Sequence, residues 1–323
     1  MGLQNEIWVA DIQKVLYQTD LNWLDYATSH DSYAGQSYGS GYRVVNIPQA
    51  SSYAAGATLN YASTLPRTVA KRSDSILSYN IDVADSGVIS FTYQDALQVS
   101  YDLRQSLIRQ NIEMLSQFIG TTILEKWAFS GLTGSFASRV VTTSGATTSA
   151  WLEGSQTGSR KNIAITDIQK LSRILDLDNM PQTDRYLILN ASMYTQLFSL
   201  NEVQNSIAFY GFQRGAVLPG KELPMLFGFN VLMRPTVLSY TTGGARNSCD
   251  AFGLYTYGAT DNIAGIAFHR SAVAKAMAGI FAYQGIEADP LMSGGQSLMA
   301  VVPFGATRLR TDNQGVAILV QGT

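Results

Sequence analysis

The sequence is poor in charge. Asp, Glu, Lys and Arg make up 14% of its 323 residues, whereas an ordinary soluble domain carries about 25%. The formal net charge of −2 provides no general attraction to nucleic acid or to an acidic membrane. A monomer with so little charge keeps an adhesive surface, and contacts with other copies are one way to bury it. The alternative is a soluble protein that is simply rich in Ser, Thr and Gly.

The chain also has little of the chemistry that catalysis or metal binding needs. It contains one cysteine, Cys249, and two histidines, His30 and His269. An intrachain disulfide is excluded, and a Cys/His metal site is disfavoured. A structural role for Cys249 is therefore favoured, and no cofactor is predicted. No apolar run reaches the length of a membrane span, and residues 1–6 lack signal-peptide and myristoylation patterns.

Two partial motifs resemble catalytic or nucleotide sites. Residues 215–222 (GAVLPGKE) nearly form a P-loop, but Glu222 replaces the Ser or Thr that holds magnesium, and Pro224 follows where a helix should begin. Residues 35–39 (GQSYG) match the nucleophile elbow of serine hydrolases, with His269 as the candidate base. The flanking residues are small and polar instead of a buried strand and a helix. A hydrolase using Ser37 and His269 is therefore a remote alternative, which loss of ester turnover in Ser37→Ala would identify.

A long helix is the strongest secondary-structure signal. Residues 93–128 contain no proline and one glycine, Gly120. Apolar residues recur there at helical spacing, including Ile112, Ile119 and Ile123. No heptad charge pattern accompanies them, so a strut packed against a sheet is predicted instead of a coiled coil. Ile112 is expected to be buried.

Two segments of opposite charge precede this helix. Residues 1–31, with a net charge of −4, are predicted to form an extended arm with a short helical patch. Trp23, Leu24 and Tyr26 in this arm are expected to lie away from the core. Residues 32–73 contain no acid and four basic residues. Strands predicted at 42–47 and 78–83 enclose a long polar excursion, which makes an extended hairpin with little core of its own. Such a hairpin suits contact with a neighbouring subunit.

The charge map predicts contacts between copies. Basic side chains of the hairpin and acidic side chains of the arm are well placed to meet across a subunit boundary, while ordinary solvated charges are the alternative. The predicted contact residues are Arg67, Lys71 and Arg72 on the hairpin, and Asp11, Asp20 and Asp25 on the arm.

The remainder indicates an α+β chain with irregular projections. A capping box at 166–169 opens a helix that ends at Pro181. A short helix is predicted at 191–200. Strands are predicted at 139–141, 186–189, 229–233, 251–257 and 263–268, and as a pair within 298–320 around a turn at 312–315.

This order of elements resembles the HK97-like major capsid proteins of tailed bacteriophages. Four sequence segments are similar to segments of that family: residues 181–197 (PQTDRYLILNASMYTQL), 227–231 (FGFNV), 267–273 (AFHRSAV) and 305–310 (GATRLR). The resemblance implies an N-terminal arm at 1–40 and an E-loop hairpin at 41–92. It further implies a peripheral domain with a spine helix at 93–180, an A-domain at 181–265, and strands returning to both at 266–323.

The resemblance also implies a function. Copies would assemble into pentamers and hexamers of an icosahedral head shell around phage double-stranded DNA, made in the bacterial cytoplasm and located in the virion, without enzymatic activity. Implied partners are further copies, a separate scaffolding protein, a portal, decoration proteins, and packaged DNA in non-specific contact, with no membrane. Some relatives crosslink a hairpin lysine to an asparagine, for which Lys71 and Asn313 are the candidates. An encapsulin-type compartment shell would share this fold and is the main alternative.

Overall fold

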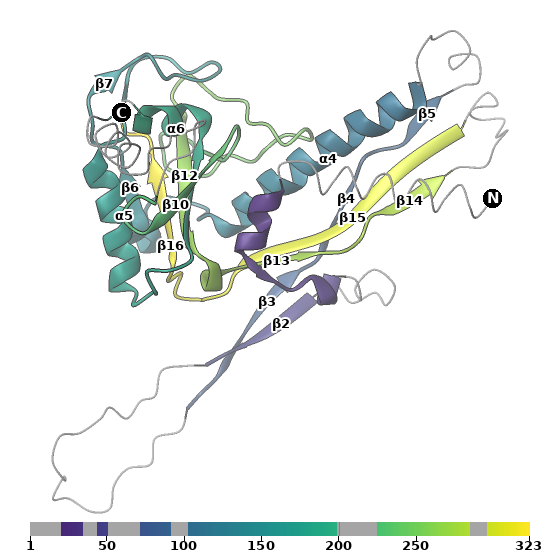
Figure 1. Cartoon of the computed structure of the whole chain (residues 1–323), viewed down its shortest axis with the longest axis horizontal. Coiled ribbons are helices and arrows are strands. Elements are labelled where there is room, and N and C mark those ends of the chain that lie inside the picture. Colours follow the sequence, from purple (N-terminus) through teal and green to yellow (C-terminus); the bar gives the residue numbers. More distant parts are fainter. Residues whose placement is uncertain are drawn as a thin grey trace, which may run out of the picture.

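A computed structural model of the chain describes residues 21–34, 44–50, 72–91, 103–198, 200, 225–284 and 296–323. Two sheets share one long helix, and a two-stranded hairpin projects away from both (Figure 1). The larger features are named here after their principal strands: the β15 sheet and the β12 sheet.

The β15 sheet is built on one 13-residue strand. Strands β13 and β14 pair with opposite ends of β15, β1 adds to β13 in parallel, and β4 and β5 pair along the other edge of β15. The bounds are β1 Thr28–Ser29, β4 Asp82–Asp85, β5 Ile89–Phe91, β13 Val273–Met277, β14 Phe281–Gln284 and β15 Gln296–Arg308.

The β12 sheet has the order β10-β9-β12-β16-β6, with β11 also pairing with β12. Its inner strands are buried along their whole length, as expected for strands covered on both faces. Helix α5 packs on β16 and β6, and α6 on β9 and β10. The bounds are β6 Val140–Thr142, β9 Arg185–Asn190, β10 Phe229–Arg234, β11 Leu238–Tyr240, β12 Asn262–His269, β16 Val316–Val320, α5 Ile165–Leu177 and α6 Ala191–Phe198. The predicted ranges place β6 and α5 with the spine helix, and that division into domains stays a prediction.

The long predicted helix is α4, Leu103–Trp127, and the segment before it lies outside the described residues. Ile112, Ile119 and Ile123 are buried against the β15 sheet, which confirms the predicted strut and the burial of Ile112. At its end, Trp127 donates from Nε1 to the Ala274 carbonyl at 2.9 Å. Arg308 of β15 donates to the carbonyl of Trp127 at 3.3 Å. Unpaired carbonyls at a helix end need such donors.

The expectation that Trp23 and Leu24 lie away from the core is wrong. Both are buried, at 7% and 1% exposure, in the 3-10 helix η1, Asn22–Tyr26. The Trp23 ring meets the Trp127 ring edge to face, with centroids 5.5 Å apart. Tyr26 is more exposed, yet it stacks on Tyr186 with centroids 4.4 Å apart. Burial of each large apolar side chain contributes about 1.5–3 kcal/mol, so these residues anchor the start of the described chain.

Three further local predictions need correction. Helix α5 begins after Ala164, with Asp167 at the third helical position accepting from the Ala164 amide at 3.0 Å, so Thr166 is not the capping residue. Residues 251–257 form a turn and irregular chain instead of a strand. The two tail strands exist, but β15 and β16 belong to different sheets and do not pair.

The projecting hairpin consists of β2, Val44–Gln49, and β3, Ser75–Asn80. The predicted strand at 78–83 is interrupted at the buried Ile81, after which the chain continues as β4. The hairpin therefore extends from the β15 sheet, as Figure 1 shows. The remaining short elements are η2 Gly134–Arg139, β7 Thr147–Thr148, β8 Arg160–Lys161 and η3 Arg270–Ala272.

Candidate assembly surfaces

The hairpin β2–β3 has two unlike faces. Opposed residues of an antiparallel pair point to the same side, and the register pairs Val44 with Asn80 and Pro48 with Ile76. All residues of this outer face are exposed, Val44 at 53% and Ile76 at 70%. The face carries no charge: it consists of Val44, Asn46, Pro48, Ile76, Ser78 and Asn80. An apolar, uncharged face on a projecting ribbon is a surface that a single chain leaves uncovered.

The opposite face fixes the hairpin to the molecule. Tyr79 and Ile81 are buried in a small cluster with Ala34 and Ala276, against which Val45 and Ile47 pack. The Tyr79 hydroxyl lies 3.1 Å from Nδ1 of His30. Burial raises the pKa of Tyr79 to about 12 and lowers the pKa of His30. The base of the hairpin is thus held firmly.

A second uncovered surface is the face of the β15 sheet opposite α4. Alternate residues of β15 point to α4 and away from it: Val302 and Phe304 enter the core, whereas Met299 and Val301 line a groove of about 790 Å³. Val83 and Tyr283 line it as well and are 44% and 46% exposed.

The rim of this groove is acidic. Asp82 and Asp85 of β4 both line it, and Asp82 forms an ion pair with Lys126 of α4. Asp85 accepts a hydrogen bond from the Gly87 amide at 3.0 Å. An apolar floor with acidic rim residues suits an apolar segment that carries positive charge.

The structure describes two of the six predicted contact residues. Arg72 binds Asp74 within its own chain, with Nε 2.7 Å from the carboxylate and its side chain 51% exposed. Asp25 binds Lys275 of β13 at 3.0 Å and keeps a side chain that is 78% exposed. Arg67, Lys71, Asp11 and Asp20 lie outside the described residues. The predicted contacts between copies therefore stay predictions.

Only one member of the candidate catalytic pair, His269, lies in the described ranges, so the Ser37–His269 alternative is not tested by the structure. Nδ1 of His269 interacts with Ser271 in its own turn, while Ser37 and residues 215–222 lie outside those ranges. Burial and the nearby Glu125 raise the pKa of Cys249 to about 11, the opposite of what a nucleophilic thiolate needs. No group of three or more His, Cys, Asp or Glu side chains that could hold a metal occurs among the described residues.

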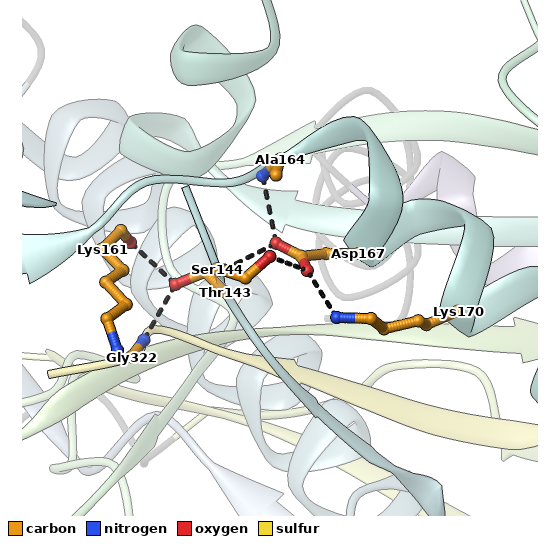
Figure 2. A network of polar contacts seen from close by, with 7 residues as sticks. All are labelled: Thr143, Ser144, Lys161, Ala164, Asp167, Lys170 and Gly322. Carbon is orange, nitrogen blue, oxygen red and sulfur yellow. Dashed lines mark hydrogen bonds and ion pairs between the residues drawn. The ribbon is translucent and has the colours of Figure 1, made fainter. Parts of the chain in front are cut away.

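The buried carboxylate of Asp167 connects segments that flank the β12 sheet. The sequence had predicted Asp167 only as part of a helix cap. Asp167 is fully buried and accepts hydrogen bonds from the amide and hydroxyl of Ser144, at 2.8 and 2.6 Å, and from the Ala164 amide (Figure 2). Lys170 lies 3.3 Å away. A buried carboxylate is stable when it is bonded in this way.

The same network fixes the chain near residue 322. Thr143 donates from its hydroxyl to the Lys161 carbonyl at 2.7 Å and accepts from the Gly322 amide at 2.8 Å (Figure 2). The Lys161 amide in turn donates to the Gly322 carbonyl at 2.8 Å. A side chain at position 322 would meet the Thr143 carbonyl at 2.7 Å, so only glycine fits.

Comparison with solved structures identifies the fold. A structure from Mycobacterium phage Che8 aligns over 91% of this chain and 89% of its own, with a TM-score of 0.60 and 17% identity. The capsid structure of Cyanophage P-SCSP1u aligns over 91% of this chain and 86% of its own, with a TM-score of 0.58 and 17% identity. The capsid of Ralstonia phage GP4 aligns over 87% and 84%, with a TM-score of 0.56 and 10% identity.

These similarities confirm the predicted fold class, the α+β HK97-like capsid fold. No family model and no curated protein sequence matches the chain. None of the helices in the described ranges is long and apolar enough to span a membrane.

Proposed function

We propose that the chain is a shell-forming structural protein of a tailed bacteriophage. More particularly, it is the major capsid protein, which assembles into the pentamers and hexamers of an icosahedral head around double-stranded DNA. The observation that carries this proposal is the hairpin β2–β3, whose outer face is uncharged and consists only of exposed residues. The capsid structures of the cyanophage and the Ralstonia phage share its fold and support the phage shell over an encapsulin compartment.

The two uncovered surfaces suggest how copies associate. The hairpin of one copy lies along the groove of a second, with its apolar outer face against Val83, Met299 and Tyr283. The basic hairpin residues then face Asp82 and Asp85, in addition to the predicted acids of the arm. Each exposed ion pair contributes at most about 1 kcal/mol, so these pairs set register and salt sensitivity more than affinity.

The chain acts in the virion without catalysing a reaction, after synthesis in the bacterial cytoplasm. A separate scaffolding protein, a portal and decoration proteins are its expected partners. The low net charge supports weak, sequence-independent contact with packaged DNA.

The test combines light scattering with electron microscopy of the purified protein, with scaffolding protein present. Closed particles are expected, and a strictly monomeric species at high concentration would contradict the proposal. Replacing Arg67, Lys71 and Arg72 by Glu should impair assembly, whereas Arg173→Glu on the exposed side of α5 should not. Rescue by Asp85→Lys would identify the groove as the acidic partner, and rescue by Asp11→Lys, Asp20→Lys and Asp25→Lys would identify the arm. Asp82 is left unchanged because it pairs with Lys126 of its own chain.

A further inference from the structure

Two connections between the β12 sheet and the β15 sheet run side by side. The first is η3, which joins the end of β12 directly to β13, and the second is residues 309–315, between β15 and β16. The Leu309 amide donates to the Ala272 carbonyl at 2.8 Å, and the His269 amide donates to the Gly315 carbonyl at 2.9 Å. The Arg270 amide also donates to the carbonyl of Asp184, just before β9, at 3.1 Å. We call residues 269–272 and 309–315 the inter-sheet joint.

His269 caps the turn at the centre of this joint. Its side chain is buried, with 6% exposure, and Nδ1 accepts a hydrogen bond from the Ser271 amide at 3.1 Å. The Ser271 hydroxyl lies 2.8 Å from the same nitrogen. An amide N–H can only donate, so Nδ1 must carry no proton. The observed turn therefore requires the neutral imidazole, with its proton on Nε2.

The charges around His269 are of both signs. Asp184, ahead of β9, favours the protonated ring, and Arg185 of β9 opposes it. Arg270 follows in η3, and Asp178 reaches the joint from the end of α5 by accepting from the Gly315 amide at 2.9 Å. Burial is the largest influence and lowers the pKa of His269, because a charged ring loses its hydration there.

We propose that His269 is an acid-sensitive latch on the inter-sheet joint. When the ring is protonated, a hydrogen on Nδ1 faces the Ser271 amide hydrogen. The Ser271 hydroxyl can rotate to accept that new hydrogen, but the amide loses its acceptor and the cap of η3 is broken. Acid then makes residues 269–272 more mobile. Because these residues connect the two sheets, the angle between the sheets can then change. Because the joint lies within one chain, this response is independent of shell formation.

The direction of the pH effect follows from the lowered pKa. Above the ordinary histidine pKa of about 6.5, the ring is neutral in both the folded and the unfolded chain, and the latch contributes fully. As the pH falls below that value, the unfolded chain binds the proton first, so the joint loses stability until the pH reaches the folded pKa.

His269→Asn is the matched test, because an asparagine oxygen replaces Nδ1 as an acceptor, suits an N-cap position and does not titrate. Hydrogen exchange of the untagged full chain would be compared at pH 7.5 and 5.0, after correction for intrinsic exchange. In the wild type, acid should speed exchange of residues 269–273 severalfold, because protonation of the ring removes the acceptor of the Ser271 amide. In the variant, the change should stay below about twofold. Equal acceleration in both proteins would overturn the proposal.

A second measurement tests the proposal even if the His269→Asn variant fails to fold. His30→Gln leaves His269 as the sole histidine of the chain, so its imidazole can be titrated by NMR without ambiguity. A pKa below the ordinary value, with loss of Ser271 amide protection over the same pH range, is expected. A His269 that titrates normally, or that titrates without changing the exchange of Ser271, would refute the latch.

Discussion

Single buried polar residues hold the elements of this molecule together. Arg185 is 1% exposed and donates to the carbonyls of Pro181 and Met180, both at 2.7 Å. Arg234 is 4% exposed, donates to the Thr236 carbonyl at 2.8 Å and lies over the Trp23 ring. The backbone partners of Arg185 lie within five residues of it. Arg234 also donates to the Gln117 carbonyl of α4 at 3.2 Å, 117 residues away in sequence, and that contact could not be predicted from spacing.

Cys249 should be an unreactive thiol at neutral pH. Its pKa is raised to about 11 by burial and by Glu125, whose carboxylate accepts from the Cys249 amide at 2.7 Å. At pH 8 its alkylation by iodoacetamide should be slower than that of an ordinary thiol by about 100-fold or more. The rate should keep rising beyond pH 9, where that of an ordinary thiol levels off.

Glu125→Gln provides the control for Cys249. The amide oxygen can still accept the hydrogen bond but carries no charge, so the pKa of the thiol should fall and alkylation at pH 8 should accelerate. An unchanged rate in this variant, or a wild-type rate that levels off near pH 9, would contradict the role given to Glu125.

Ile112→Ala tests the burial of α4. The Ile112 side chain is 2% exposed within the main core, so its truncation should lower the free energy of unfolding by about 2–5 kcal/mol. Gln110→Ala, at an exposed position of the same helix, should change it by less than about 0.5 kcal/mol. Urea denaturation of both variants measures the difference, and equal stabilities would show that the assignment of the buried face is wrong.

At the scale of elements, the pattern of apolar residues predicted helices and strands well where one face of the element, or the whole element, is buried. The centre of α4 and the strands β9 and β12 were predicted from their apolar residues. Prediction failed at 251–257, where Asp250 accepts from the Phe252 and Leu254 amides, both at 2.9 Å, and closes a turn that competes with a strand. It also failed at Trp23, because its partners Trp127 and Arg234 are more than a hundred residues away in sequence.

The turn at 250–254 should depend on glycine at position 253. Gly253 has a φ of +72°, and a side chain there would meet the Phe118 backbone of α4 at 2.6 Å. Gly253→Ala should therefore lower the free energy of unfolding by about 2–4 kcal/mol. Gly279→Ala, where no atom lies within 4 Å of the added carbon, is the matched control and should change stability by less than about 0.5 kcal/mol. Thermal unfolding of the two variants tests this, and a Gly253→Ala protein as stable as its control would disprove the close approach.

Substitutions at two hairpin positions should distinguish an effect on particle assembly from an effect on the stability of the chain. Ile76 is 70% exposed on the outer face, whereas Ile81 is 3% exposed at its base. Ile76→Ser should leave the unfolding midpoint almost unchanged and reduce the yield of particles in sedimentation. Ile81→Ser should destabilise the chain itself by about 2–4 kcal/mol. Normal particle yield from Ile76→Ser would argue against the outer face as an assembly surface.

At the scale of the whole molecule, the low content of charged residues has a structural counterpart. Apolar and uncharged side chains remain on the hairpin and on the open face of the β15 sheet, where further copies could cover them. The overall α+β fold and the projecting hairpin were predicted from the order of elements. The groove was not predicted, since it forms where β4 meets β14 and β15, which follow it far along the chain.

Binding to DNA should be weak and indifferent to sequence. The formal charge of −2 leaves few phosphate contacts, and such contacts carry no base information. In a competition assay at physiological salt, specific and random duplexes should displace a labelled probe equally well, and raising the salt should weaken both together. Preference for one sequence by the isolated subunit would contradict this.

The position of β16 in its sheet has a consequence for synthesis. β16 lies between β12 and β6, although β9 and β6 precede it by more than a hundred residues. At about 5–20 residues per second, a ribosome takes roughly 6–25 s to progress from β9 to β16. During that interval the edge of β6, and then that of β12 once it is made, remain without β16, and the sheet cannot be completed. Only a chain translated through residue 320 can therefore present a finished β12 sheet to a growing particle, so the competence of a subunit waits for the synthesis of β16.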